Sequence, residues 1–506
     1  MKLLFGIFTE NMSYPASMLG YLAKQNGWDV EIVFFQDNAT EEDITNILIK
    51  YNPDLIALTM RTLERFTAFR VARAARQFKA KILAGGIHVT NSQMDVVSSG
   101  LFDGIVVGDG MGVWEDILHS YNTLDGQIIK GKPHPNASLY TKRIFSDSQK
   151  TKLKQSKRID ILSGLGCPFN CHFCSGTKHY MEFPIEEVVN QLVVAKRTFG
   201  IKAVAVQDET FSYSLKRLRS FRRLLASHGI GFLFDVQTRT NCFNKEIADE
   251  LAALGVENVT FGVETVSPKL LKFINKRTTA EDAYHTAEIC KQYNFPFRAN
   301  FLFGLPTQDE EDYEITWQFI QIVKPDVICL YYFMPYPGSY LYDYCMQNGY
   351  FPDNFSFDKY SCIMENKPNL NKIDYDMADY YVNKIKDFDN EHKEDIIAQQ
   401  ALKADTYNWI IFGAADYFYR VLEMLSKYEW KNCLGYYDYR GDIFRTQDYN
   451  IKIPQYSLKA GSKRPDMILT TYHKGRSFNE IIQPIIREKF KYNGEIVSVS
   501  SFKHEH

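Results

Sequence analysis

Short apolar runs alternate with amphipathic stretches through the first 125 positions of the chain. Five such runs read as strands: residues 3–8, 30–35, 55–59, 81–84 and 104–107. Between them, stretches such as 68–78 carry apolar residues at helical spacing. Strands that alternate with helices predict a parallel sheet covered by helices on both faces. We therefore expect an N-terminal Rossmann-like α/β domain.

The same alternation returns between residues 159 and 350. Six apolar runs predict strands there: residues 159–162, 203–207, 232–236, 258–262, 297–303 and 327–333. Six strands with intervening helices favour a partial, open (β/α)6 barrel over a closed eight-stranded one. Functional residues of such barrels lie at the carboxyl ends of the strands.

The last hundred residues begin a third alternating unit. Strands are expected at 409–412, 433–437, 467–470 and 495–499, with a helix at 478–488. This pattern predicts a small C-terminal Rossmann-like α/β domain. The polar and basic stretch 126–158 predicts a linker with an edge hairpin. The expected division is an N-terminal domain 1–130, a linker 131–158, a barrel 159–350, a connector 351–400 and a C-terminal domain 401–506.

Composition narrows the possible classes. Of 506 residues, 45% are hydrophobic and 24% are charged, which is typical of a globular chain. The net charge is −2, so the chain has no overall positive charge that would attract nucleic acid. The sequence contains no run of about 18 apolar residues, so we expect no membrane-spanning helix. The opening run is interrupted at Glu10 and lacks a cleavage site, so we expect a buried strand and no signal peptide.

The chain has nine cysteines, too few for a disulfide scaffold of this length. Six are scattered, which favours reduced, mostly buried thiols and a cytoplasmic protein. These are Cys242, Cys290, Cys329, Cys345, Cys362 and Cys433.

The other three, Cys167, Cys171 and Cys174, follow the first barrel strand with the spacing C-x3-C-x2-C. Three thiolates on one loop can bind three corners of a cubic iron–sulfur cluster and leave the fourth iron open. Zinc usually takes four ligands in two pairs, but the chain has no second C-x2-C and His172 is crowded by its neighbours. His179 is a conceivable extra ligand, and three buried structural cysteines are the remaining alternative.

The cysteine motif, with the aromatic Phe173 before its last cysteine, resembles the radical SAM superfamily. The resemblance implies a 4Fe–4S cluster whose open iron binds the amino and carboxylate groups of S-adenosylmethionine. Reductive cleavage then yields a 5′-deoxyadenosyl radical that abstracts hydrogen. An external one-electron reductant, such as a flavodoxin or ferredoxin, would be a partner.

The resemblance also implies contacts from the carboxyl ends of the barrel strands. Asp208 and Glu209 would meet the amino group of S-adenosylmethionine, and Glu264 the ammonium or the ribose hydroxyls. For each acid alone, an ordinary strand-end salt bridge is the alternative. The other expected cofactor-binding residues are Phe173, Gln237, Arg239, Arg298 and Gly304, the last in an adenine-contacting turn.

A parallel α/β domain directly before such a barrel is similar to the cobalamin-binding radical SAM subclass, and the resemblance covers about residues 1–350. It implies that Thr59, Gly85, Gly86 and Gly108 border the corrin or its nucleotide tail. His88 would bind the tail or pack internally. The chain lacks the Asp-x-His-x-x-Gly run whose histidine binds cobalt in many cobalamin proteins. Residues after Thr59, including Met60 and Arg61, are then the candidates for the lower face.

The C-terminal unit has no such clear match. Residues 413–418 stand where a Gly-x-Gly-x-x-Gly loop would lie, but two of the glycines are missing. Asp438 falls where a ribose-binding acid is expected, and residues 473–476 could meet a phosphate. Recognition of a nucleotide-like substrate moiety and a structural or dimerising role both remain open.

Together these features predict a cobalamin-dependent radical enzyme. The expected reaction methylates an unactivated carbon, or phosphorus, of a small-molecule biosynthetic intermediate through a 5′-deoxyadenosyl radical and methylcobalamin. The alternative is a non-methylating radical SAM enzyme that catalyses oxidative cyclisation, ring contraction or rearrangement. A non-catalytic binding protein is a third possibility, against which the intact cysteine triplet argues.

Overall fold

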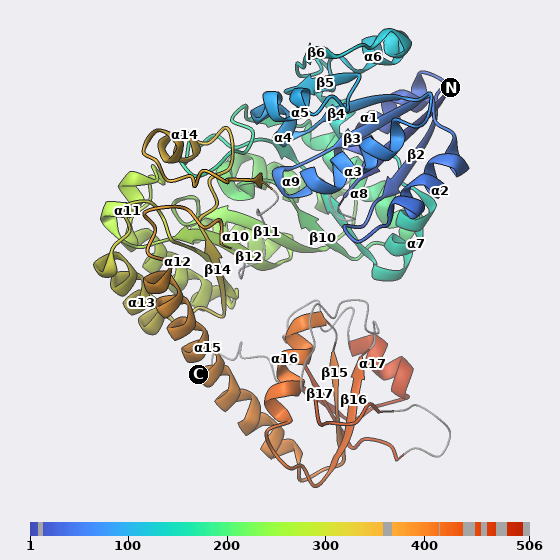
Figure 1. Cartoon of the computed structure of the whole chain (residues 1–506). Coiled ribbons are helices and arrows are strands. Elements are labelled where there is room, and N and C mark those ends of the chain that lie inside the picture. The colour runs from blue at the N-terminus through green and yellow to red at the C-terminus, as the bar shows by residue number, and fades with distance from the viewer. Residues whose placement is uncertain are drawn as a thin grey trace.

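The computed structural model describes residues 1–8, 14–357, 367–413, 415–438, 451–456, 463–471 and 483–498. Three parallel sheets follow one another along the chain, and a long helix separates the second from the third (Figure 1). The predicted fold class is confirmed: a Rossmann-like domain, a partial barrel and a small α/β domain.

The N-terminal sheet has six parallel strands in the order β2-β1-β3-β4-β5-β6. Alternate residues of β1 enter two different cores: Leu3 and Phe5 pack with α1 and α6, whereas Leu4 packs with α2 and α3. Burial on both faces explains why these strands are continuous apolar runs. The strands are β1 (Lys2–Ile7), β2 (Asp29–Phe34), β3 (Leu55–Thr59), β4 (Lys81–Gly85), β5 (Gly104–Val107) and β6 (Gln127–Lys130). The helices are α1 (Tyr14–Gln25), α2 (Glu41–Tyr51), α3 (Arg65–Ala75), α4 (Ile87–Asn91), α5 (Gln93–Ser98) and α6 (Trp114–Ser120).

The polar stretch after β5 differs from the prediction. Instead of an edge hairpin, it supplies β6, which pairs in parallel with β5. It also contains α7 (Asp147–Ser156), whose N-terminus is closed by a capping box between Ser146 and Gln149. Strand β6 is an edge strand with mostly exposed residues, so it lacks the apolar run by which its neighbours were predicted.

The second sheet, in the order β14-β13-β12-β11-β10-β7, is an open barrel of six parallel strands. The six expected strands are all present. They are β7 (Arg158–Ile161), β10 (Ala203–Val206), β11 (Leu233–Arg239), β12 (Val256–Glu264), β13 (Phe297–Phe303) and β14 (Val327–Tyr332). The helices between them are α8 (Ile185–Phe199), α9 (Leu215–Ser227), α10 (Lys245–Leu254), α11 (Pro268–Phe273), α12 (Ala280–Tyr293) and α13 (Glu310–Val323), and α14 (Tyr340–Gln347) follows β14.

The barrel strands have one apolar and one polar face. In β13, Phe297, Ala299 and Phe301 are buried, whereas the alternate residues Arg298 and Asn300 are only partly buried. Successive strand residues point to opposite faces of a sheet. The outward face therefore packs on helices, and the inward face brings polar side chains to the barrel interior.

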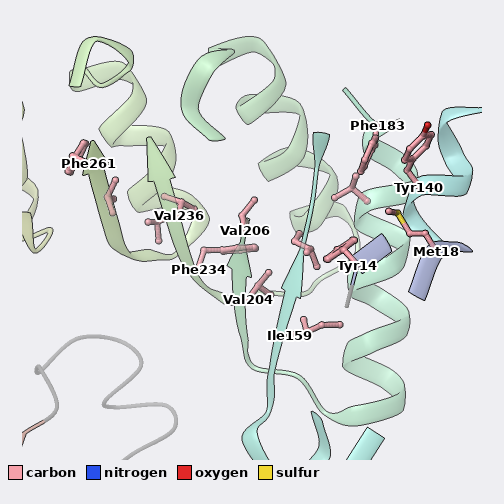
Figure 2. Close-up of a cluster of buried hydrophobic side chains, with 14 of the residues drawn as sticks. Tyr14, Met18, Tyr140, Ile159, Phe183, Val204, Val206, Phe234, Val236 and Phe261 are labelled. Carbon is pink, nitrogen blue, oxygen red and sulfur yellow. The ribbon is translucent and has the colours of Figure 1, made fainter. Parts of the chain in front are cut away.

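The first two domains share one hydrophobic core. In Figure 2, Tyr14 and Met18 from α1 and Tyr140 lie beside Ile159 and Phe183 of the barrel unit. The Leu162 backbone N–H donates to the Tyr14 hydroxyl at 2.6 Å. A continuous core of this kind packs the N-terminal sheet and the barrel together as one unit.

Helix α15 (Tyr375–Ala404) runs from the barrel to the C-terminal domain (Figure 1). It lies against α13, where Tyr381 donates to Glu314 and Phe388 packs on Trp317. The third sheet has the order β16-β15-β17-β18. Its elements are β15 (Trp409–Gly413), α16 (Ala415–Leu425), β16 (Cys433–Asp438), β17 (Met467–Thr470), α17 (Gln483–Phe490) and β18 (Glu495–Ser498). The expected helix at 478–488 corresponds to α17, and residues 478–482 lie outside the described chain.

Candidate functional site

The cysteine loop is held at its base by a short antiparallel pair, β8 (Gly164–Leu165) with β9 (Met181–Glu182). Gly166 has φ +75°, and a Cβ there would collide with the backbone carbonyls of Thr177 and His179. The Cys167 backbone N–H donates to the Thr177 carbonyl at 3.0 Å. Glycine at 166 thus lets the chain fold the loop back on itself, and this closes the cysteines around one space.

Cys167, Cys171 and Cys174 all line one cavity. Arg239 donates to the Cys171 sulfur at 3.0 Å, and the Gly176 backbone N–H donates to the Cys174 sulfur at 3.3 Å. Such donors stabilise thiolates, the form that binds metal. Without a metal, burial raises the pKa of Cys174 to about 11. The set of three thiolates that share one cavity fits three corners of an iron–sulfur cluster.

The two histidines of the loop have other positions. His172 Nδ1 lies 2.7 Å from the Phe273 carbonyl, and its ring lies against Tyr340, so it braces the loop against α11 and α14. His179 is exposed. Among the described residues, no three His, Cys, Asp or Glu side chains are grouped closely enough to hold a single metal ion. A cubic cluster presents a separate iron to each thiolate, so the three sulfurs need not converge on one point.

The adjacent acids Asp208 and Glu209 have different environments. Both Asp208 oxygens accept from Ser163, one from its backbone N–H at 2.6 Å and the other from its hydroxyl at 2.5 Å. Asp208 is therefore tied to the segment leading into the cysteine loop and does not line the cavity. Glu209 does line it. Desolvation, and then the neighbouring Asp208 charge, raise the pKa of Glu209, so a cationic group in the cavity would be a favourable partner.

Glu264 adopts a strained backbone conformation at the end of β12. Its φ is +68°, and the pairing of β12 with β13 shifts register at this point. A left-handed conformation is uncommon for residues other than glycine, asparagine and aspartate, and often accompanies function. The Glu264 carboxylate accepts from Lys276 Nζ at 2.9 Å, and both residues line the cavity. This buried ion pair adds charged groups of both signs to the wall.

Of the other barrel residues predicted to bind the cofactors, three line the cavity and two do not. Phe173, Gln237 and Arg239 line the cavity. Arg239 also donates to the Lys276 carbonyl and lies over the Phe169 ring, 4.0 Å from its centroid. Gly304 is not among the lining residues, and a Cβ there would contact Ile373 and Tyr375 at 3.4 and 3.6 Å. Arg298 is also absent from the lining, although Asn300, two residues further on, and Thr260, paired with it on β12, are present.

Sequence reasoning missed Lys276, Thr210 and the link between Arg239 and Cys171. The Cys167 sulfur lies 3.8 Å from the Thr210 hydroxyl. Lys276 stands in a polar loop after α11, where nothing in the local pattern distinguishes it from a surface lysine. Only the barrel geometry brings these residues to the cavity.

The carboxyl edge of the N-terminal sheet is formed by loops after β3, β4 and β5. Gly86 has φ +105°, and a Cβ there would lie 2.6 Å from the Met60 carbonyl, so the loops after β3 and β4 pack closely. A Cβ on Gly85 would have no atom within 4 Å, and this leaves open space above the strand end. Thr59 is partly buried, and the Gly108 backbone N–H donates to the Thr90 hydroxyl at 3.0 Å. The open position at Gly85 fits close approach of a flat ligand.

His88 does not point at this open edge. It is 1% exposed, with one ring nitrogen 3.2 Å from the Thr62 hydroxyl and the other 3.0 Å from an Asp95 oxygen. Burial opposes ionisation of Asp95, but bonds from His88 and Arg65 outweigh it and lower the pKa of Asp95 to about 2. Of the two roles left open by the sequence, packing is the one that the structure supports.

Met60 and Arg61 were the candidates for the lower face of cobalt. Met60 is 1% exposed within the core of α2 and α3, and Arg61 is paired with Glu64 at 2.6 Å. Burial therefore keeps Met60 from a corrin at this edge, whereas Arg61 is held by Glu64 with 38% of its side chain exposed. The segment after β1, residues 9–13, lies outside the described chain.

The edges of the N-terminal sheet and of the barrel meet directly. The Asn91 side chain of α4 donates to the backbone carbonyl of Ser175, next to Cys174, at 3.4 Å. Asn91 also packs against Gly338, and the His88 ring lies 5.3 Å from that of Phe357. Ligands held at the two edges would therefore be neighbours.

In the part of the C-terminal sheet's carboxyl edge that the structure describes, the position beside Gly413 is occupied by the protein's own side chains. A Cβ on Gly413 would collide with the Phe418 ring and with the Thr471 hydroxyl. Phe418 is completely buried, and Asp438 accepts from the Tyr419 hydroxyl at 2.6 Å. Glycine at 413 thus makes room for an internal side chain. Residues 414 and 473–476 lie outside the described chain.

Two family models match the chain at the two edges that form the site. The model of the radical SAM superfamily matches residues 161–320, and the model of the B12 binding domain matches residues 12–118. With the cysteine cavity and the facing glycine loops, these matches show that the chain belongs to the cobalamin-binding class of the radical SAM superfamily. Its cofactors are a 4Fe–4S cluster, S-adenosylmethionine and cobalamin.

Curated relatives are similar at low identity. An uncharacterized methyltransferase of Pyrococcus horikoshii is 25% identical over 66% of this chain and 79% of its own length. An anaerobic magnesium-protoporphyrin IX monomethyl ester cyclase of Rubrivivax gelatinosus is 24% identical over 69% and 68%. A bacteriochlorophyllide d C-8(2)-methyltransferase of Chlorobaculum tepidum is 26% identical over 58% and 69%.

Solved structures agree on the fold. The radical S-adenosylmethionine methyltransferase TsrM of Kitasatospora setae, with cobalamin and a 4Fe–4S cluster bound, has a TM-score of 0.59 at 16% identity, covering 70% of this chain and 76% of that one. The cobalamin-dependent radical enzyme OxsB has a TM-score of 0.53 at 17% identity, covering 63% and 51%. In the part of this chain that the structure describes, no helix has the length and apolarity needed to cross a membrane.

Proposed function

We propose that this chain transfers a methyl group from S-adenosylmethionine to an unactivated carbon, or phosphorus, of a small-molecule biosynthetic intermediate. The observation that carries the proposal is the contact between the cysteine loop and α4 of the B12-binding domain, through Asn91 and Ser175. When bound, the cluster and S-adenosylmethionine supply a carbon radical and cobalamin supplies a methyl group. The proposed reaction needs both at one place.

The residues of this chain would hold and orient those groups. Cys167, Cys171 and Cys174 would bind the cluster, and Arg239 would place its guanidinium against the Cys171 thiolate. Glu209 would accept from the ammonium of S-adenosylmethionine, a charge-assisted bond of about 1.5–3 kcal/mol. The Glu264–Lys276 pair would bind ribose hydroxyls or the amino-acid end of the same molecule, and Thr59, Gly85, Gly86 and Gly108 would border cobalamin.

A reductant and a compartment complete the proposal. We propose that an external one-electron donor such as a flavodoxin or ferredoxin serves the cluster. All cysteines that the structure describes are free, which favours the reducing cytoplasm.

The second candidate function is a radical oxidative cyclisation. It is favoured by the similarity to the magnesium-protoporphyrin IX monomethyl ester cyclase, which is named as a cyclase and not as a methyltransferase. Both reactions would use the same cavity and cofactors, so the fate of the methyl group separates them.

The test follows that methyl group. The chain is reconstituted anaerobically with iron, sulfide and hydroxocobalamin and given S-adenosylmethionine with a trideuterated methyl group, a reductant and a size-filtered extract of the source cells. We expect a product that carries the trideuterated methyl, formed by the wild type but not by the Cys171→Ala variant. If 5′-deoxyadenosine accumulates while the label stays in S-adenosylmethionine and cobalamin, methyl transfer to substrate is wrong.

A further inference from the structure

The barrel interior continues below the cysteine cavity as a polar layer. Gln237 of β11 is paired with Thr260 of β12, and Thr260 is paired with Arg298 of β13. Residues at the same level of paired parallel strands point to the same face. Gln237 and Thr260 line the cavity, as does Asn300, two residues beyond Arg298 on the same face. Arg298 therefore faces the interior, immediately behind the lining.

Arg298 is a partly buried cation without a partner. Its Nε is buried and has no hydrogen-bond partner, and among the described residues no hydrogen bond or ion pair of the Arg298 side chain is found. Two other arginines of the barrel have acidic partners: Arg158 lies 2.5 Å from Asp235, and Arg222 lies 2.6 Å from Glu250. Arg143, before the barrel, also has a buried Nε without a partner, but its Nη1 donates to the Asp160 carbonyl. An unpaired charge out of water is costly, so an arginine left in this state suggests a missing anion.

Glu209 lies higher, after β10 at the cavity wall, and the acids nearer to Arg298 or below its level are already engaged. Asp235 is bound by Arg158 and by the side-chain amide of Asn258, at 2.5 and 2.6 Å. Asp389 of α15 approaches Cys329, as does Arg298, but it is bound by Lys393 at 2.5 Å. Asp160 lies deeper, at the level of Asp235, beside Arg158 and Arg143. The anion for Arg298 must then come from outside the described chain.

We propose that Arg298 binds a carboxylate of the methyl acceptor, with Gln237 and Asn300 as neighbouring donors. The guanidinium fork matches a planar carboxylate in two parallel hydrogen bonds. The carboxylate of S-adenosylmethionine is expected at the open iron, beside the cysteines, whereas Arg298 lies below the level of Asn300. The substrate is therefore a carboxylate-bearing small molecule that enters the barrel interior. This inference rests on the proposed function for the identity of the occupant.

The test uses the reconstituted full chain, with acetate as the probe and chloride at equal ionic strength as the reference. For the wild type we expect acetate at saturating concentration to raise Tm by about 2 °C. Arg298→Met abolishes this rise, and its Tm in chloride equals or exceeds that of the wild type because an unpaired cation has been removed. Arg158→Met is the matched control: it loses the ion pair with Asp235, so its Tm in chloride falls while the acetate rise remains.

A second measurement separates substrate from cofactor. Binding of radiolabelled S-adenosylmethionine by equilibrium dialysis is expected to stay within twofold of wild type in Arg298→Met. A tenfold loss of that affinity would assign the guanidinium to the cofactor carboxylate and overturn the proposal. An equal acetate rise in wild type and Arg298→Met would also overturn it. If Arg298→Met does not fold, Arg298→Gln replaces it with the same expectations. None of these measurements involves methyl transfer, so their outcome is independent of the test of the proposed function.

Discussion

The barrel and the C-terminal domain both present glycines and acids at strand ends, yet among the described residues they are used differently. At the barrel edge, three cysteines, Glu209 and the Glu264–Lys276 pair surround open space. At the C-terminal edge, Phe418 and Thr471 occupy the position beside Gly413, and Asp438 is bound by Tyr419. A glycine or an acid at a strand end therefore indicates where a ligand could bind, and the packing around it decides whether one does.

The largest expected effect concerns the cysteines at the barrel edge. Replacing Cys171 by Ala removes one of three thiolates, so we expect the visible absorption of the cluster and the activity to be lost. The measurement is the absorption spectrum and iron content after anaerobic reconstitution. Cys433→Ala, in the C-terminal domain, is the control and keeps the full spectrum. Retained colour and activity in Cys171→Ala would contradict the assignment of the cluster.

The next effect concerns Phe418, which packs beside Gly413 in the C-terminal domain. Phe418→Ala empties a buried site, and we expect the free energy of unfolding of the C-terminal domain to fall by about 3–4 kcal/mol. Chemical denaturation followed by far-UV circular dichroism measures it, while the cluster spectrum stays unchanged. A variant as stable as wild type would show that Phe418 does not fill this edge.

Two acids at strand ends, Glu209 and Asp438, are expected to differ in their effect on the binding of S-adenosylmethionine. Glu209→Gln removes the charge that faces the cavity, so the Kd of S-adenosylmethionine is expected to rise about 10-fold or more. Asp438→Asn, at a strand end of the C-terminal sheet, leaves that Kd unchanged. Equilibrium dialysis with the reconstituted chain checks both. Equal effects from the two variants would remove the distinction between the edges.

The smallest effect in this series concerns cobalamin. Gly85→Leu adds a side chain where no atom lies within 4 Å, so we expect unchanged Tm but a several-fold weaker retention of hydroxocobalamin after gel filtration. Gly86→Ala, in contrast, meets the Met60 backbone and is strained at φ +105°, so its Tm falls. Undiminished corrin absorption in Gly85→Leu would show that cobalamin does not approach this edge.

Much of the fold could be predicted because its strands are buried. Strands such as β3 and β13 combine apolar runs with sharp ends, and burial enforces that pattern. Strand β6 was not predicted, because an exposed edge strand need not keep an apolar face. The domain boundaries proposed from composition remain predictions.

The location of the site, at the carboxyl ends of the barrel strands, could be predicted from the sequence. The contacts of its individual side chains could not. The cysteine spacing favoured a cluster, because the chain offers no second C-x2-C for a four-ligand zinc site. Nothing in the sequence separates Asp208 from Glu209, because only the turn after β10 directs one to Ser163 and the other to the cavity. Lys276 reaches Glu264, at 2.9 Å, from the loop after α11, 12 residues further along the chain. Long-range contacts of this kind have no local signature.

The shared site is tested most directly by a crystal structure of the anaerobically reconstituted chain with S-adenosylmethionine and hydroxocobalamin. We expect a cluster on Cys167, Cys171 and Cys174, S-adenosylmethionine beside Glu209, and the corrin between this cavity and the loops at Gly85 and Gly108. Either ligand bound at the C-terminal edge beside Gly413, with the barrel cavity lacking both, would contradict this expectation.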